Sequence, residues 1–387
     1  MIREYSIAIY LTLFKLLFSM MNLLKLKNKI VFVSSFGDNV EFVANQIASR
    51  TDCKIIIVKG KKCSINPTTF PMVNFIPLES KNPFQFVRMI YHLATSKFVF
   101  VDNYFGFLAV TNFKKQVKCI QLWHAAGAIK RFGLENPSNV NRSTRAMKRF
   151  QQVYDRFDYV VSGSDKMATI FTKSFGMKNE SRILKTGIPR TDFFFHQEKM
   201  DSIKGELRKR YPLIDKKKVI LYAPTYRESD LTESRIALDL DMMYEHLRED
   251  YVILLKLHPA VLDKDKVKLP SFLINVSDYP NINHLLTITD ILITDYSSIP
   301  MEFSYLEKPM IFYAYDLEEY EEERGFWEDY QKNIPGPIAF NTKEIIQLIK
   351  KDTFDLGKIK TYSEIWNQYS NGHSSENLLK ALDITKV

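Results

Sequence analysis

The sequence predicts an α/β protein with two doubly wound parallel sheets, one in each half of its 387 residues. The first observation is that short runs rich in valine and isoleucine alternate along the chain with helical stretches. The second is that most of these runs are apolar throughout, which is typical of strands that helices cover on both faces. The third is that the runs form two series, separated by a polar stretch at residues 190–212. A chain of this length suits two domains.

The elements are expected in the following order. Strands of the first series are expected at residues 30–34, 54–58, 98–102, 119–122 and 159–162. Strands of the second series are expected at residues 219–223, 252–257, 291–294 and 310–315. Helices are expected at residues 39–50, 142–157, 202–210 and 241–248. We therefore expect domains at residues 29–195 and 196–387, preceded by an N-terminal helix within residues 1–28.

The N-terminal segment is strongly apolar over residues 7–26. Its polar residues are Thr12, Lys15, Ser19 and Asn22, which helical spacing places in one stripe, and three lysines follow between residues 25 and 29. This pattern predicts an amphipathic helix that lies on an anionic membrane surface. A buried core helix and a spanning or exported segment are the alternatives. Small residues that would mark a signal-peptide cleavage site do not follow the apolar run.

Composition narrows the class of partner. The 54 Lys and Arg residues against 45 Asp and Glu give a formal charge of +9, which favours nucleic acid, a phosphorylated substrate or an acidic lipid surface. Three cysteines exclude a disulfide scaffold. The sequence has no glycine-rich dinucleotide motif, no Walker lysine motif and no His-Glu-x-x-His motif. We therefore expect neither a bound cofactor nor a resident metal.

Two histidines each follow an expected buried strand. His124 precedes two alanines and Gly127, and His258 precedes Pro259. Ligands of such sheets bind beyond the carboxyl ends of the strands, and imidazole accepts a proton near neutral pH. The pair therefore suggests a catalytic cleft between two sheets. The alternatives are that His124 caps a helix and that the position of His258 is a coincidence.

Two further strand ends carry groups suited to phosphate. Asp295, Ser297 and Ser298 precede an expected helix start, where free backbone N–H groups and the helix dipole bind anions. Arg227 follows the strand at 219–223 and could grip a phosphate with two hydrogen bonds. The alternatives are an ordinary helix cap for the serines and an exposed loop position for Arg227.

Two blocks of the sequence are rich in charged residues of a single sign. Residues 114–149 contain nine basic residues and one acid, and Arg142, Arg145 and Arg149 share one helical face. We expect this face to attract a diphosphate or lipid headgroups, although most charge runs are only solvated surfaces. Residues 316–329 contain eight acids. For this block we favour a solvated helix or an inter-domain contact over a metal site.

Six motifs occur together and in order. They are Trp-His-x-x-Gly at 123–127, Tyr-Ala-Pro-Thr-x-Arg at 222–227, Lys-Leu-His-Pro at 256–259, Thr-Asp-Tyr-Ser-Ser at 294–298, Pro-x-x-Phe-Tyr-x-Tyr-Asp at 309–316 and Arg-Gly at 324–325. With this set, residues 95–375 resemble the CDP-glycerol:poly(glycerophosphate) glycerophosphotransferase family of teichoic acid synthesis. The resemblance implies a GT-B-like fold, which consists of two Rossmann-type domains with the active site in the cleft between them.

The resemblance also implies roles for particular residues. His124 would take the proton from the acceptor hydroxyl, and His258 would hold the migrating phosphoryl oxygens or the leaving CMP. The residues assigned to the donor side are Thr225, Arg227, Lys256, Asp295, Ser297, Ser298 and Glu302. The residues assigned to the side of the acceptor's lipid diphosphate are Gly127, Lys130, Arg142, Arg145 and Arg149.

Within the family, the short chain and the sequence Trp-His-Ala-Ala-Gly are most similar to the members that prime wall teichoic acid. The implied reaction transfers glycerol phosphate from CDP-glycerol to a ManNAc-GlcNAc disaccharide on diphosphoundecaprenol and releases CMP. The implied location is peripheral, on the cytoplasmic side of the cell membrane, with other teichoic acid enzymes as further partners and no nucleic acid.

Other functions stay open at this point. A glycerol- or ribitol-phosphate polymerase of the same family, or a transferase of that family that adds the second unit, is the nearest alternative. A non-catalytic membrane-bound scaffold belongs to another class, and so does a sugar-nucleotide glycosyltransferase or epimerase of the same fold. The requirement for a divalent metal is also open.

Overall fold

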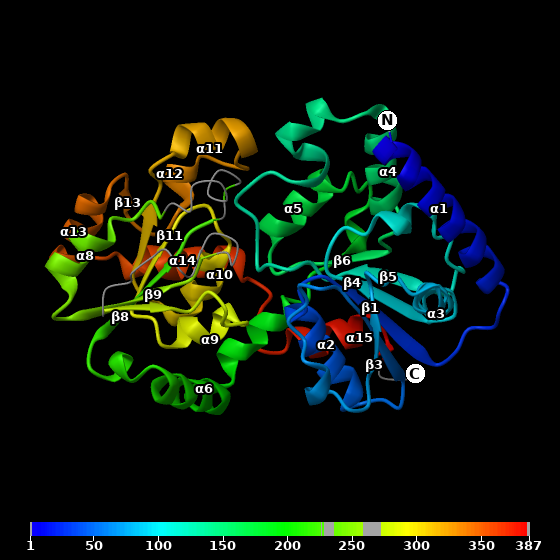
Figure 1. Cartoon of the computed structure of the whole chain (residues 1–387), viewed down its shortest axis with the longest axis horizontal. Coiled ribbons are helices and arrows are strands. Elements are labelled where there is room, and N and C mark those ends of the chain that lie inside the picture. Colours follow the sequence, from blue (N-terminus) through cyan, green and yellow to red (C-terminus); the bar gives the residue numbers. More distant parts are fainter. Residues whose placement is uncertain (1, 226, 228–235, 258–271, 385–387) are drawn as a thin grey trace. The chain divides into compact units, whose positions relative to one another are not determined.

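The computed structural model describes residues 2–225, 227, 236–257 and 272–384. These residues form two compact units, each built on one parallel sheet (Figure 1). The first unit consists of Met1–Ala125, Phe132–Asp192 and Gln368–Val387, and the second consists of Ala126–Arg131 and Phe193–Asn367. The predicted α/β class with two parallel sheets is confirmed.

The first unit contains a seven-stranded parallel sheet in the order β3-β2-β1-β4-β5-β6-β7. Its strands are β1 (Lys29–Ser34), β2 (Lys54–Lys59), β3 (Asn74–Pro77), β4 (Phe98–Val101), β5 (Lys118–Gln121), β6 (Tyr159–Val161) and β7 (Ile183–Leu184). All five strands expected from the first series form. The sheet also includes β3 and β7, which the sequence pattern did not reveal.

Helices cover the first sheet on both faces, as the uniformly apolar strands require. They are α2 (Asp38–Ala48), α3 (Pro83–Ala94), α4 (Thr144–Tyr154), α5 (Asp165–Ser174) and α15 (Ser374–Ala381). The core on one face joins β1 to α2 through Phe32 and Val43, and to α15 through Leu378. Figure 1 shows α15 beside α2.

The second unit contains a six-stranded parallel sheet in the order β10-β9-β8-β11-β12-β13. Its strands are β8 (Lys218–Ala223), β9 (Tyr251–Leu255), β10 (Leu273–Asn275), β11 (Ile291–Thr294), β12 (Met310–Tyr313) and β13 (Ile338–Ala339). Numbered from β8, this is the order 3-2-1-4-5-6 of dinucleotide-binding Rossmann folds. Its helices are α6 (Gln197–Arg210), α8 (Leu240–Leu247), α9 (Ile282–Thr287), α10 (Ile299–Phe303), α11 (Leu317–Arg324), α12 (Tyr330–Asn333), α13 (Thr342–Lys351) and α14 (Leu356–Trp366).

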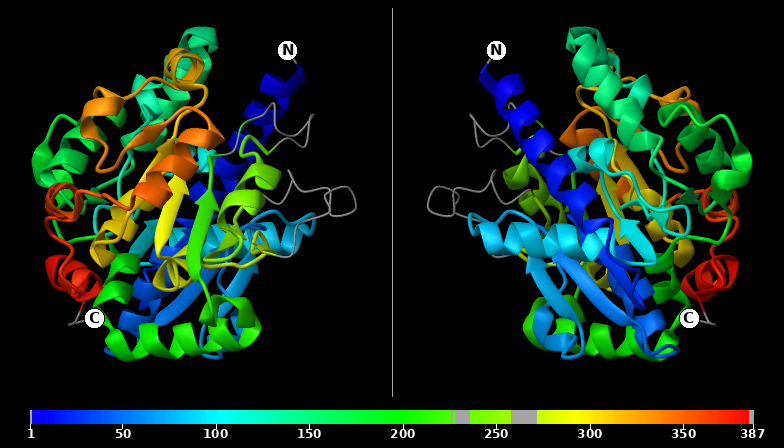
Figure 2. Two further views of the ribbon diagram at one scale, coloured as in Figure 1. Left: turned by 90° about the vertical axis from the view of Figure 1, so that its left-hand side faces the viewer. Right: turned by 90° about the vertical axis from the view of Figure 1, so that its right-hand side faces the viewer.

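The N-terminal helix α1 (Ile2–Met21) packs on the first unit through Phe14 and Phe18, which are 0% and 1% exposed. Their rings lie 4.9 to 5.9 Å from those of Phe86 in α3, Phe107 and Phe113. Figure 2 shows α1 running beside α3. The helix therefore has an apolar face buried against the protein, which the polar stripe alone did not predict.

A second apolar face of α1 points to solvent. Ile9, Leu13, Leu16 and Met20 recur every three or four residues and are 49 to 70% exposed. Helical spacing places them opposite Phe14 and Phe18. We call these four residues the exposed face of α1. By length and composition alone, the segment Glu4–Met21 could cross a membrane.

The compact units differ from the expected domains 1–28, 29–195 and 196–387. Residues 368–387 return to the first unit, because Leu378, Leu379 and Leu382 of α15 and the turn after it complete the core beside α2. Residues 126–131 lie in the second unit although 124 and 125 lie in the first. The N-terminal helix is part of the first unit rather than a separate element.

Candidate active site

Each sheet has a point at which the strand order reverses, between β1 and β4 in the first unit and between β8 and β11 in the second. Loops that follow the carboxyl ends of these strands diverge there, and such points bind ligands in α/β folds. The motif residues around His124 follow the adjacent strand β5, and those around Arg227 and Asp295 follow β8 and β11. The polar residues of the motifs therefore lie at the carboxyl ends of these strands.

His124 lies three residues after β5 and is half-buried between two aromatic rings. The ring centroids of Phe36 and Trp123 each lie 4.4 Å from that of the imidazole. Its Nδ1 atom lies 3.2 Å from the backbone carbonyl oxygen of Asp102. A carbonyl oxygen only accepts hydrogen bonds, so this contact makes Nδ1 the donor and leaves the basic lone pair of the neutral ring on Nε2.

The backbone around His124 is held in an uncommon conformation. Trp123 has a backbone φ angle of +61°, which residues other than glycine rarely adopt. The Asn39 side chain donates to the carbonyl oxygens of Leu122 and Trp123 at 3.3 and 2.9 Å. Arg190 donates to the carbonyl oxygen of His124 at 2.9 Å. These hydrogen bonds hold the backbone that carries the His124 side chain in one position, as a preorganised base requires.

In the second unit, Arg227 forms the centre of a buried ion cluster. It pairs with Asp295 at 2.9 Å and with both carboxylate oxygens of Asp316, and its side chain is 10% exposed. The guanidinium also lies over the rings of Tyr296, Tyr315 and Tyr320. Burial lowers the pKa of Arg227, but the hydrogen bonds and charges of Asp316 and Asp295 together outweigh it, so the pKa is raised above its usual value. The exposed loop position is therefore wrong, and the two carboxylates compete with any phosphate for this side chain.

Asp295 joins the loops that follow β8 and β11. Its side chain is 2% exposed and accepts hydrogen bonds from the N–H groups of Thr225 and Tyr296 as well as from Arg227. Asp295 thus shapes the site rather than presenting a free carboxylate. The Thr225 hydroxyl is buried and has no hydrogen-bond partner within the described chain. A bound ligand could satisfy it.

The serines after β11 have different surroundings. The Ser297 hydroxyl bonds to Thr294 at 2.9 Å and accepts from the N–H of Ile299 at 3.3 Å, so it acts as an internal cap. Ser298 is half-buried, and its side chain does not cap the helix. The helix it precedes, α10, is five residues long, which weakens the dipole argument made from the sequence. Glu302 is fully buried on that helix.

Lys256 follows β9 and donates to the carbonyl oxygens of Ser277 and Tyr279 at 2.8 and 2.6 Å. Burial lowers its pKa. In this structure the lysine therefore ties two loops together rather than reaching outward. His258, the second histidine predicted to be catalytic, lies outside the described residues.

The segment 126–131, which we call the crossing segment, packs entirely within the second unit. A Cβ atom on Gly127 would lie 2.6 Å from the Trp366 ring and 2.8 Å from the sulfur of Met301, so the glycine allows close packing. Lys130 forms a bridge with Phe326 and lies over the Tyr320 ring. Gly127 and Lys130 were expected on the acceptor side, but they belong to the second unit, as do the residues expected to bind the donor.

The basic residues near α4 are less uniform than expected. Arg142 precedes the helix and stacks over Phe150, with 5.0 Å from its guanidinium carbon to the ring centroid. Arg145 is exposed. Arg149 lies 3.5 Å from Glu4 of α1, so it is partly neutralised by the N-terminal helix. Two of the three arginines thus have local partners.

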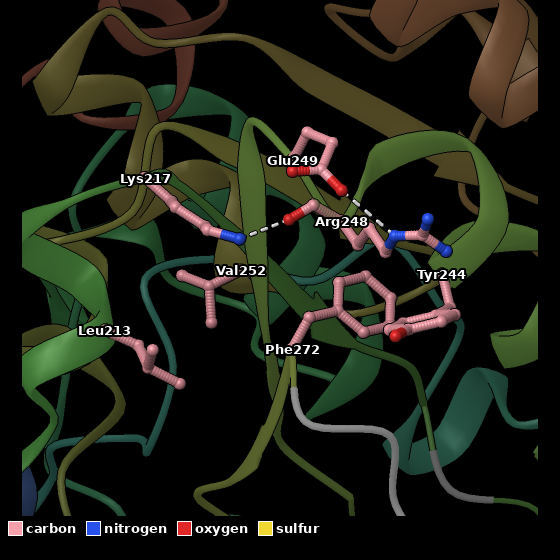
Figure 3. A pocket seen from close by; sticks show the side chains of 7 residues that line it. All are labelled: Leu213, Lys217, Tyr244, Arg248, Glu249, Val252 and Phe272. Carbon is pink, nitrogen blue, oxygen red and sulfur yellow. Dashed lines mark hydrogen bonds and ion pairs between the residues drawn. The ribbon is translucent and has the colours of Figure 1, made fainter.

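One cavity of about 300 Å³ lies elsewhere in the second unit (Figure 3). It is lined by Leu213, Lys217, Tyr244, Arg248, Glu249, Val252 and Phe272. Lys217 and Phe272 immediately precede β8 and β10, and Val252 is the second residue of β9, so the cavity lies at the amino ends of the strands. It is thus at the opposite edge from the candidate site. Within the described ranges, no group of three or more potential metal ligands occurs.

Comparison with known proteins decides the family. Residues 16–383 match the profile of CDP-Glycerol:Poly(glycerophosphate) glycerophosphotransferase. The chain belongs to this family. It is 39% identical over 361 residues to the teichoic acid glycerol-phosphate primase of Bacillus subtilis (strain 168), covering 93% of this chain and 92% of the relative. It is 32% identical to the teichoic acid poly(ribitol-phosphate) polymerase of Bacillus spizizenii (strain W23), covering 95% of this chain and 58% of the relative.

A solved structure of the wall teichoic acid polymerase TagF superposes with a TM-score of 0.79 at 26% identity, covering 100% of this chain and 98% of that chain. The glycerophosphotransferase family and the GT-B-like fold predicted from the motifs are thereby confirmed.

Sequence reasoning missed several residues that surround His124. Asp102, Phe36, Asn39 and Arg190 all surround His124, yet none was a candidate. Asp102 ends the run at 98–102, so its position after a buried strand was a usable signal. Asn39 and Arg190 act on backbone atoms far away in sequence, and no local pattern marks such contacts.

Proposed function

We propose that this glycerophosphotransferase transfers glycerol phosphate from CDP-glycerol to the ManNAc-GlcNAc disaccharide of diphosphoundecaprenol as the priming step of wall teichoic acid synthesis. The observation that carries the proposal is the match to a primase along almost the whole of both chains. The relatives that are polymerases of ribitol phosphate match over a smaller share of their own length. A variant of TagF soaked with CDPG has the same fold as this chain, with a TM-score of 0.79.

The proposed reaction is a displacement at phosphorus. The acceptor hydroxyl oxygen attacks the phosphorus that carries glycerol, the bond from this phosphorus to the bridging oxygen breaks, and CMP leaves with that oxygen. Nε2 of His124 takes the proton of the attacking hydroxyl. The contact of Nδ1 with the carbonyl of Asp102 supports this role, because it selects the tautomer whose Nε2 is basic. His258 keeps its proposed role at the phosphoryl oxygens or the leaving CMP.

The donor is assigned to the second unit. The unpartnered Thr225 hydroxyl and the Ser298 side chain supply hydrogen-bond donors near the ends of β8 and β11. Lys130 supplies a positive charge from the crossing segment. Arg227, Lys256, Asp295, Ser297 and Glu302 shape these loops in the proposal, because their side chains are buried or already bonded. CMP release with CDP-glycerol, but not with CDP-ribitol, tests the choice of donor.

Lys130 gives the donor site a pH dependence. Burial lowers the pKa of Lys130 to about 8, against a smaller opposing effect of Asp295, and Arg324 and Arg227 lower it further. The Tyr320 ring lies beneath the ammonium group. The lysine is charged below this pKa and neutral above it. We therefore expect the Kd of CDP-glycerol to rise up to about tenfold per pH unit above pH 8.

Calorimetric titrations of CDP-glycerol between pH 7 and 9.5 measure this effect. Lys130→Arg is the matched control, because arginine stays charged throughout the range. Its donor affinity should be nearly independent of pH. Lys130→Gln should bind weakly at every pH. A wild-type Kd that stays constant to pH 9.5 would remove Lys130 from the donor site.

We further propose that the exposed face of α1 enters the cytoplasmic surface of the membrane, where the lipid-linked acceptor resides. Near the end of the helix, Lys114 contacts the carbonyl of Leu24. An apolar stripe with a basic end suits an anionic bilayer. Because Phe14 and Phe18 are buried against the protein, the helix lies along the unit rather than extending from it.

Leu16→Glu should weaken binding to vesicles that contain anionic phospholipid by at least about tenfold, since burying a leucine contributes about 1.5–3 kcal/mol. Sedimentation with vesicles measures the bound fraction. Met72→Glu is the control, because Met72 is an exposed apolar residue of the same unit outside α1, with 91% of its surface exposed. Point substitutions are used because removing residues 1–28 would uncover Phe86, Phe107 and Phe113. Equal vesicle binding by both variants would show that α1 is not the membrane contact.

A further inference from the structure

A carboxylate occupies the turn that follows β1 in the first unit. Asp102, at the end of β4, is 1% exposed. It accepts hydrogen bonds from the Ser34 hydroxyl at 2.6 Å and from the N–H groups of Ser35, Phe36 and Gly37 at 2.8, 3.0 and 3.1 Å. Three successive N–H groups before a helix are the arrangement with which Rossmann folds bind phosphate. In this chain they bind a side chain of the protein itself.

The same turn reaches the imidazole of His124. Phe36, whose N–H is held by Asp102, stacks on the His124 ring with 4.4 Å between centroids and 20° between planes. The backbone carbonyl of Asp102 contacts Nδ1 of that ring. Asp102 therefore acts on His124 by two routes: its main chain meets the ring edge, and its side chain holds the residue that covers the ring face.

We propose that Asp102 is the positioning residue for His124, setting the tautomer and orientation of the imidazole through its carbonyl oxygen and, through the turn at 35–37, through Phe36. The inference rests on the proposed function of His124 as the base. Since an anion already fills the turn, the same carboxylate keeps phosphate out of it. The nucleotide is then left to the second unit, in which Asp295 accepts a hydrogen bond from the N–H of Thr225 in the corresponding loop.

Loss of the Asp102 carboxylate should therefore affect the rate of the chemical step and the affinity for the donor differently. Without the carboxylate, the turn loses the acceptor for three N–H groups, and Phe36 is no longer fixed against the imidazole. The ring then samples orientations in which Nε2 does not face the acceptor hydroxyl. The chemical step should slow, whereas the affinity for CDP-glycerol should not change, because the donor residues belong to the other unit.

Asp102→Asn should lower kcat by about 10- to 100-fold, which is part of the full contribution of a general base. The KM for CDP-glycerol should stay within about twofold. The matched control is Asp192→Asn. Asp192 is also buried in the first unit, at 4% exposure, and accepts bonds from the N–H groups of Ser374 and Ser375 and from the Ser375 hydroxyl. It holds α15 rather than His124. Asp192→Asn should lose similar thermal stability and keep its kcat.

The tautomer provides a readout that a purely structural role would not change. In protein labelled with ¹⁵N-histidine, the His124 signals are identified by their loss in His124→Gln. They should report Nδ1–H in the wild type and in Asp192→Asn, and a mixture of tautomers in Asp102→Asn. Phe36→Leu keeps the turn but removes the stacked ring, and it should lower kcat several-fold with the donor KM unchanged.

The outcomes separate the two proposals. If His124→Gln keeps its turnover, the proposed base is wrong. If His124→Gln is inactive but Asp102→Asn and Asp192→Asn have equal kcat, the positioning role alone is overturned. Should Asp102→Asn fail to fold, Ser34→Ala removes one of the four bonds to the carboxylate, and an unchanged kcat and tautomer in that variant would overturn the role as well.

Discussion

Replacing His124 by glutamine should lower kcat by at least about a hundredfold, because general base catalysis typically contributes 10²–10⁴-fold. Glutamine fills much of the space between Phe36 and Trp123 but cannot accept the proton at neutral pH. The KM for CDP-glycerol should change little, since the donor is assigned to the second unit. Initial rates of CMP release with a lipid-linked disaccharide measure both constants.

His373→Gln is the control for this substitution, because His373 is a surface histidine whose side chain is 69% exposed. It should behave as the wild type. Because His124 contacts two aromatic rings and the carbonyl of Asp102, His124→Ala would leave a gap, so glutamine is the better replacement. A His124→Gln enzyme that is folded and retains most of its turnover would contradict the assignment.

Replacing Arg227 by alanine should lower the free energy of unfolding by about 3–5 kcal/mol, the usual consequence of removing one partner of a buried ion pair. Asp295 and Asp316 would then lie buried without their cation. Tyr296, which donates to Asp316 at 2.9 Å, offers only partial compensation. Urea unfolding followed by fluorescence measures the change. Arg227→Lys should recover part of the stability but not the two-point contact with Asp316.

Arg248→Ala provides the contrast. Arg248 pairs with Glu249 at 3.0 Å, but the two side chains are 45% and 83% exposed. An exposed pair contributes about 0–1 kcal/mol, so this variant should unfold nearly as the wild type does. Equal losses in the two variants would mean that the cluster around Arg227 does not stabilise the second unit.

The strands of both sheets were largely predictable from the sequence, because burial on both faces leaves uninterrupted apolar runs such as that of β1. The short strands were not. β7 and β13 contain two residues each, which is too few for any periodicity to emerge. The packing of α15 on the first unit was also not predictable, because the apolar stripe of a helix does not indicate which of the two sheets the helix covers.

The candidate site likewise contains residues that were predictable from the sequence and residues that were not. His124 was predictable, because a lone histidine at the tip of a buried strand is a local pattern. The surroundings of Arg227 were not, because its partners Asp295 and Asp316 lie 68 and 89 residues further along the chain. A loop arginine has the same sequence signature whether it binds a phosphate or two carboxylates. The placement of Lys130 on the donor side likewise depends on the chain crossing into the second unit at residue 126.

The number of units added to the acceptor tests priming most directly. The full chain is incubated with an excess of CDP-glycerol and the ManNAc-GlcNAc-diphosphoundecaprenol acceptor, and the lipid products are weighed by mass spectrometry over time. We expect a single product that is heavier than the acceptor by one glycerol phosphate and that persists while donor remains. A ladder of products carrying many glycerol phosphates, or product formed only with CDP-ribitol, would contradict it.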